Sequence, residues 1–77
     1  MIVTKHKVRV LDTGEDRLTL EIDGKTVSAD WRALSPRLAE APQVAREAIE
    51  VSPAGYGLHW PLVDEDLSID GILREFA

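Results

Sequence analysis

The Asp23-Gly24 pair limits the possible folds of this chain more than any other feature, because segments of alternating polarity flank it. Asp-Gly is a preferred sequence for the type I′ turn, the two-residue turn that joins antiparallel strands. With these two residues in the turn, every neighbouring apolar side chain falls on one face, as a fixed register requires. The facing pairs are then Leu20 with Val27 and Leu18 with Ala29. The sequence therefore predicts a β-hairpin centred on this turn.

Basic residues at every second position near the N-terminus predict a further strand, from about Val3 to Val10. Its exposed face would carry the basic side chains Lys5, Lys7 and Arg9, and His6 would be an ordinary strand residue. Lysines on an edge strand discourage pairing with other sheets. A polar loop over residues 11–16 would lead into the hairpin, so we expect a three-stranded antiparallel meander.

Two prolines divide the middle of the chain into short helical segments. Asp30 can cap a segment over residues 31–34, and Ser35 before Pro36 has the pattern of an N-cap and a first helical residue. Pro42 can open another short helix. The residues expected on the buried face of this region are Trp31, Leu34, Leu38, Val44 and Ile49.

The C-terminal third contains signals for a strand pair and a terminal helix. Residues 49–51 favour a strand, and the sequence SPAGYG that follows favours a turn. In the next strand His59 would point away from the apolar face, and Pro61 would end the strand. The apolar face of this strand would consist of Tyr56, Leu58 and Trp60. A solvated acidic turn would then lead to Ser68, the expected N-cap of a helix with an apolar stripe formed by Ile69, Ile72, Leu73 and Phe76.

The order of these elements predicts a single α+β domain over residues 1–77. It would contain an N-terminal three-stranded antiparallel meander, one or two short helices, a C-terminal hairpin or strand pair, and a terminal amphipathic helix. A chain of 77 residues lies near the lower size at which a core stabilises a fold alone, so a partner or a second copy would add to its stability. A homodimer is therefore left open.

The composition indicates a globular protein of the cytoplasm. Cysteine is absent, which excludes disulfides and thiolate chemistry, and neither a signal peptide nor a membrane span is indicated. The net charge of −5 favours basic partners and disfavours nucleic acid as a ligand of this chain alone.

One group of side chains suggests chemistry: His59 together with Asp64, Glu65 and Asp66. Such a group could serve as a metal site or an acid–base site. Consecutive side chains do not converge without special backbone geometry, so we favour a strand histidine beside a solvated turn. The aromatic residues Trp31, Tyr56 and Trp60 could stack on a ligand, but their positions favour core packing. We therefore predict no catalytic residues, no metal and no cofactor, and do not expect an enzyme.

The segment Ser52–Pro61, SPAGYGLHWP, and the segment Leu62–Leu73, LVDEDLSIDGIL, resemble the C-terminal signature of the bacterial family known as domain of unknown function 2442. The resemblance covers nearly the whole chain and implies the same small α+β fold. It also implies a position beside a small partner protein, in arrangements that look like toxin–antitoxin modules. Some relatives carry an added helix-turn-helix, for which this chain has no room. The family supplies no catalytic residues.

Two functional classes follow from these observations. The first is a protein–protein interaction module, an antitoxin-like protein that binds a small basic protein encoded by an adjacent gene through its acidic surface and a free sheet edge. Its candidate contact residues are Tyr56, His59, Asp64, Glu65 and Asp66. The alternative is a DNA-associated regulator that binds as a dimer through Lys5, Lys7 and Arg9 on the first strand.

Overall fold

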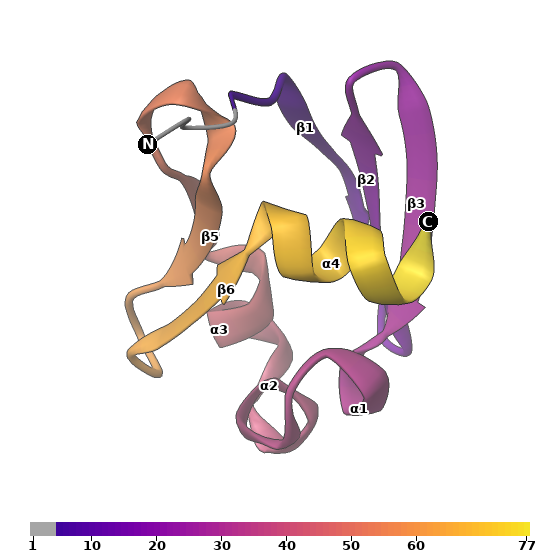
Figure 1. Cartoon of the computed structure of the whole chain (residues 1–77). Helices are drawn as coiled ribbons and strands as arrows, with labels where there is room; N and C mark the ends of the chain where they lie inside the picture. The colour runs from indigo at the N-terminus through magenta and orange to yellow at the C-terminus, as the bar shows by residue number, and fades with distance from the viewer. Residues whose placement is uncertain (1–4) are drawn as a thin grey trace.

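An antiparallel three-stranded sheet forms the N-terminal part of the molecule (Figure 1). The computed structural model describes residues 5–77. The strands are β1 (Val8–Thr13), β2 (Arg17–Ile22) and β3 (Lys25–Asp30), with β2 in the middle. The predicted meander is confirmed.

The turn between β2 and β3 has the predicted backbone. The φ angles of Asp23 and Gly24 are 51° and 86°, and positive values at both positions are those of a type I′ turn. The facing pairs are the predicted ones, Leu20 with Val27 and Leu18 with Ala29. All four of these side chains are buried, so the hairpin presents one apolar face to the core.

The first strand begins later than the sequence predicts. We expected a strand over residues 3–10, but β1 begins at Val8, and residues 3 and 4 lie outside the described part of the chain. The main chain of residues 5–7 is held by other contacts: His6 N–H donates to the Ala54 carbonyl, and Lys7 C=O accepts from Asp23 N–H, both at 2.9 Å. These hydrogen bonds replace the expected strand pairing.

The expected polar loop over residues 11–16 is also shorter than predicted, because β1 continues to Thr13. The pairing with β2 is interrupted between Val10 and Asp12, and Leu11 has no partner in the register. A bulge of this kind adds one residue to a strand without ending the sheet. It therefore allows the strand to extend into a segment whose polarity pattern is irregular.

Three short helices follow: α1 (Trp31–Leu34), α2 (Pro36–Glu40) and α3 (Gln43–Glu47). Ser35 caps α2 as predicted, since its Oγ accepts from Leu38 N–H at 3.3 Å. Asp30 does not cap α1. Its carboxylate accepts from Arg17 Nη2 at 2.9 Å, because Asp30 is still paired with Arg17 at the end of β3.

Of the five residues predicted to form the buried face of this region, Trp31 and Leu38 are buried, Leu34 and Ile49 are partly buried against the core, and Val44 in α3 is not buried. The side chain of Val44 is 66% exposed, and its neighbour Ala45 is buried instead. The helix begins at Gln43, which turns position 45 toward the core. Trp31 and Leu38 are fully buried, as expected.

A second antiparallel sheet consists of β4 (Glu50–Val51), β5 (Gly57–Trp60) and β6 (Glu65–Ser68), in that order. The 3₁₀ turn η1 (Pro53–Gly55) joins β4 to β5, which confirms the predicted strand pair. Tyr56 does not join the inward face of β5. It has helical backbone angles (φ −72°, ψ −33°) at the end of η1, so the strand alternation does not reach it, and it is 41% exposed.

Strand β6 replaces most of the predicted acidic turn. Residues 61–64 form the turn, and the positive φ of 51° at Asp64 reverses the chain. Residues 65–68 then pair with β5, with Leu67 opposite Leu58. The sequence did not predict this strand because the segment is strongly acidic and Leu67 is the only large apolar residue of β6.

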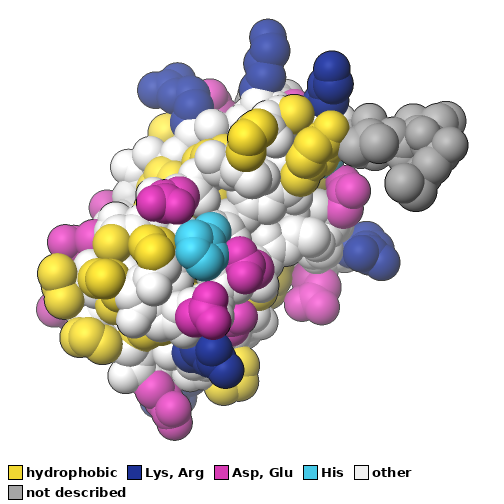
Figure 2. Space-filling view, turned by 90° about the vertical axis from the view of Figure 1, so that its left-hand side faces the viewer, with side chains coloured by type: hydrophobic (Ala, Val, Ile, Leu, Met, Phe, Trp, Pro, Cys, Tyr) yellow, Lys and Arg dark blue, Asp and Glu magenta, His cyan; other side chains and the backbone are white. Residues whose placement is uncertain are grey.

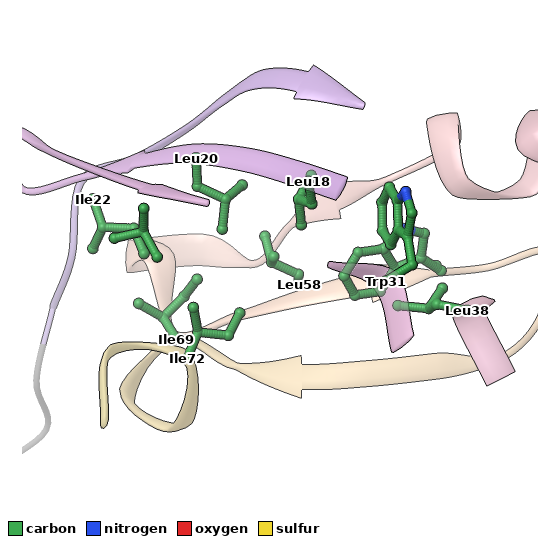
Figure 3. Close-up of a cluster of buried hydrophobic side chains, with 10 residues drawn as sticks. Leu18, Leu20, Ile22, Trp31, Leu38, Leu58, Ile69 and Ile72 are labelled. Atoms are coloured by element: carbon green, nitrogen blue, oxygen red, sulfur yellow. The ribbon is translucent and has the colours of Figure 1, made fainter. Parts of the chain in front are cut away.

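Helix α4 (Ile69–Phe76) completes the fold and contacts β3, β5 and β6. Ser68 caps it as predicted, with its Oγ accepting from Gly71 N–H at 2.9 Å. In Figure 1 the helix runs from the end of β6 toward β3. Figure 3 shows the core between these elements. The two sheets, α1, α2 and α4 supply its buried side chains: Leu18, Leu20, Ile22, Val27, Trp31, Leu38, Leu58, Trp60, Ile69 and Ile72.

The two tryptophans occupy one end of the core. Their rings meet edge to face, with centroids 6.3 Å apart, and each indole N–H donates to a main-chain carbonyl, Trp31 to Gly14 at 2.8 Å and Trp60 to Arg46 at 3.2 Å. The Arg46 guanidinium lies 5.5 Å from the centre of the Trp31 ring and donates to the carbonyl of Leu38 at 2.8 Å. Core packing of both tryptophans is confirmed.

Ser35 connects the helical region to the second sheet, which leads to a stability prediction. Its buried Oγ accepts from Leu38 N–H and donates to the Glu65 carboxylate. Ser35→Ala removes both bonds and should lower the free energy of unfolding by about 2–3 kcal/mol. The matched variant Ser68→Ala removes an exposed cap alone and should cost about 1 kcal/mol. Equal losses in urea unfolding would mean that the bond to Glu65 contributes nothing.

Candidate functional site

The outer face of the second sheet carries a row of polar side chains. His59 lies between Glu50 and Asp66 in the register of β4, β5 and β6, so these three residues share the face opposite Leu58 and Trp60. His59 Nδ1 lies 2.7 Å from Asp66 Oδ1, and this hydrogen-bonded pair is open to solvent. One face of a small sheet thus combines an imidazole with two carboxylates.

A shallow hollow of about 290 Å³ lies beside this row. Tyr56, His59 and Asp66 line it together with Ser52 and Leu67. Figure 2 views the molecule from this side and shows a histidine with acidic side chains around it and hydrophobic side chains nearby. The hollow combines an exposed aromatic ring with negative charge, which suits a ligand that has both apolar and basic groups.

The five candidate contact residues do not form one cluster. Tyr56, His59 and Asp66 line the hollow, whereas Asp64 lies in the turn before β6. Glu65 points to the opposite face, where its carboxylate accepts from Ser35. Neighbouring residues of a strand point to opposite faces, so β6 itself separates Glu65 from Asp66.

The acidic segment and His59 do not assemble into a metal site. Within residues 5–77, no three histidine, cysteine, aspartate or glutamate side chains lie close enough together to hold a metal ion. The interaction that does form is the His59–Asp66 pair. This exposed pair can form hydrogen bonds and charge interactions with a ligand on the surface.

The three basic residues of the DNA-binding alternative are not arranged along one strand. Lys5 and Lys7 precede β1, and only Arg9 belongs to it. Arg9 Nη1 lies 3.4 Å from Glu21 Oε1 on β2, so an acidic side chain partly offsets its charge. The basic ribbon is therefore not formed as expected, and DNA binding by a dimer stays a prediction.

His6 is the residue whose environment the sequence did not reveal. We expected an ordinary strand residue, but its ring lies between the carboxylates of Asp23 and Asp70. The two hydrogen bonds with Asp23 and with the adjacent Asp70 raise the pKa of His6 above its ordinary value of 6.5. Because these partners are far away in the sequence, no local pattern could have indicated them.

No helix within the described part of the chain has the length and apolar character needed to cross a membrane.

The protein is of the α+β class, with two small antiparallel sheets and a C-terminal helix. The outer face of its second sheet has acidic side chains and an exposed tyrosine beside them. The family model described as "Protein of unknown function (DUF2442)" matches residues 8–77. The chain belongs to this family, as its C-terminal signature indicated.

A crystal structure of a protein of unknown function from Rhodospirillum rubrum is similar in both fold and sequence. The TM-score is 0.70 and the sequence identity is 30%, over 88% of this chain and 87% of the other. The comparison with curated proteins gave no match. The relatives therefore support the fold and the family, and their descriptions specify no activity.

Proposed function

We propose that this protein is a protein–protein interaction module that binds a small basic protein against the outer face of the β4–β5–β6 sheet. The observation that supports this role is the hollow lined by Tyr56, His59 and Asp66. In the finer form of the proposal, suggested by the family resemblance, the module acts as an antitoxin-like protein that masks its partner.

Charge supports a basic partner. The chain has a net charge of −5, and Asp66 and Glu50 are both exposed on the same face of the sheet as His59. Complementary charge raises the rate of association and selects among partners more than it raises affinity. A lysine or arginine of the partner placed in the hollow would meet the Asp66 carboxylate.

Exposed apolar surface supports a protein as the ligand. Tyr56, which directly follows the η1 turn, is an exposed hydrophobic residue that lines the hollow. Tyrosine is enriched at interfaces because it offers a large rigid contact area and a hydroxyl group. An apolar residue of the partner next to its basic side chain would cover this ring.

Co-purification from the native host tests the proposed function. The tagged chain should recover a small basic protein at low ionic strength, and raising the salt from about 0.1 M to about 1 M, which shortens the Debye length from about 10 Å to about 3 Å, should release it. Recovery of the tagged chain alone at low ionic strength would contradict the proposal.

A further inference from the structure

The segment of residues 5–7 lies between three elements that are distant in sequence. Its main chain bonds to η1 through Ala54 and to the β2–β3 turn through Asp23. Lys7 N–H also donates to Asp23 Oδ1 at 2.8 Å. The segment therefore joins the first sheet to the turn that precedes β5.

The His6 side chain adds a third connection, to α4. His6 Nδ1 lies 2.7 Å from Asp23 Oδ2, and His6 Nε2 lies 2.8 Å from Asp70 Oδ1. The side chain is only 7% exposed. An ionised carboxylate can only accept hydrogen bonds, so both ring nitrogens must donate. This geometry requires the doubly protonated imidazolium.

Within residues 5–77, the charged groups that face the ring come from two elements. The β2–β3 turn supplies Asp23 and the first turn of α4 supplies Asp70, whereas η1 presents only main chain. The exposed residues Lys5 and Lys7 flank His6 in the chain, and Lys7 attracts the Asp23 carboxylate. The environment of the ring is thus predominantly negative.

We propose that His6, Asp23 and Asp70 form a proton-dependent clasp that fastens residues 5–7 to the β2–β3 turn and α4, and that opens when His6 loses its proton. A neutral imidazole keeps one N–H. One ring nitrogen would then direct a lone pair at a carboxylate oxygen less than 3 Å away. The nearly buried ring has little access to water that could relieve this repulsion.

The direction of the pH dependence follows from the two shifts. Because the hydrogen bonds raise the pKa of His6, its contribution to stability is complete below 6.5 and is lost as the pH rises through the folded-state value. The hydrogen bond with His6 lowers the pKa of Asp23 from 3.8. The contribution of Asp23 to stability is therefore complete above 3.8 and is lost as the pH falls through the lower folded-state pKa. The clasp is closed between these limits and opens on the alkaline side.

An NMR titration of the histidine rings tests the clasp. In the wild-type protein, the His6 ring should lose its proton above pH 6.5, and the amide signals of His6, Lys7 and Asp23 should shift with the same midpoint. Asp70→Asn should lower the midpoint of His6 by about 1 pH unit or more. The matched change Asp66→Asn removes the carboxylate next to the other histidine and should leave the His6 midpoint in place.

Amide hydrogen exchange supplies a second readout in the wild-type chain. Above the midpoint the protection factors of the His6 and Lys7 amides should fall at least tenfold, while the amide of Leu20 in the central strand keeps its protection. A His6 ring that titrates at or below 6.5 would overturn the clasp. Unchanged protection at His6 and Lys7 across the midpoint would overturn it as well.

Discussion

Replacing Gly55 with alanine should destabilise the protein by about 2–5 kcal/mol, the sum of a left-handed backbone penalty and of overpacking. Gly55 has a φ of 68°, and a Cβ atom there would lie 2.1 Å from the His6 carbonyl oxygen and 2.9 Å from its carbonyl carbon. Both obstacles are main-chain atoms, so no side-chain rotation relieves the clash. Urea unfolding followed by circular dichroism measures the loss.

Gly24→Ala is the matched control for this prediction. Gly24 also has a positive φ, 86°, but nothing lies within 4 Å of the position of its Cβ atom. The control should therefore lose about 1–2 kcal/mol, the backbone penalty alone. If Gly55→Ala lost no more stability than Gly24→Ala, residues 5–7 would not pack against η1 as the structure shows.

Trp60→Ala should be at least as damaging, with a loss of about 3–5 kcal/mol in the free energy of unfolding. Trp60 is fully buried, and its removal leaves a cavity next to the Trp31 ring. It also leaves the Arg46 carbonyl without the hydrogen bond that the indole N–H donates to it. Because the two tryptophans are in contact, the remaining Trp31 should report the change through its fluorescence.

Leu62→Ala is the control, two residues further along the chain. Leu62 is 62% exposed in the turn before β6, so its truncation should change stability by less than about 0.5 kcal/mol. Similar unfolding midpoints for Trp60→Ala and Leu62→Ala would show that the ring of Trp60 is not part of the core.

The parts of the fold that the sequence predicted correctly depend on local interactions. The Asp23-Gly24 turn sets the register of its own flanking strands, and the serines at positions 35 and 68 cap the helices that follow them directly. Such features are decided within a few residues, so polarity patterns and turn chemistry reveal them.

The features that the sequence did not reveal depend on distant partners. Strand β6 is an acidic segment that becomes a strand because Leu67 pairs with Leu58 and packs against the core. The late start of β1 has the same cause, since residues 5–7 bond to η1 and to the β2–β3 turn. Neither partner can be inferred from neighbouring residues.

The candidate site was predicted in part, for a reason that β6 makes clear. Treating residues 64–66 as a solvated turn placed three carboxylates together beside His59. In the strand, Asp66 faces His59 while Glu65 turns inward to Ser35. Tyr56 joins the hollow because the end of η1 turns its ring outward instead of into the core.

The measurement that tests the proposed interface most directly is co-purification with two charge-reversal variants. Asp66→Lys reverses a charge in the hollow, and Glu40→Lys makes the same change in net charge at an exposed position of α2. Wild-type and Glu40→Lys chains should recover the same small basic protein at low ionic strength, and Asp66→Lys should lose it while remaining folded by circular dichroism. Equal recovery by both variants would contradict a binding site on the outer face of the β4–β5–β6 sheet.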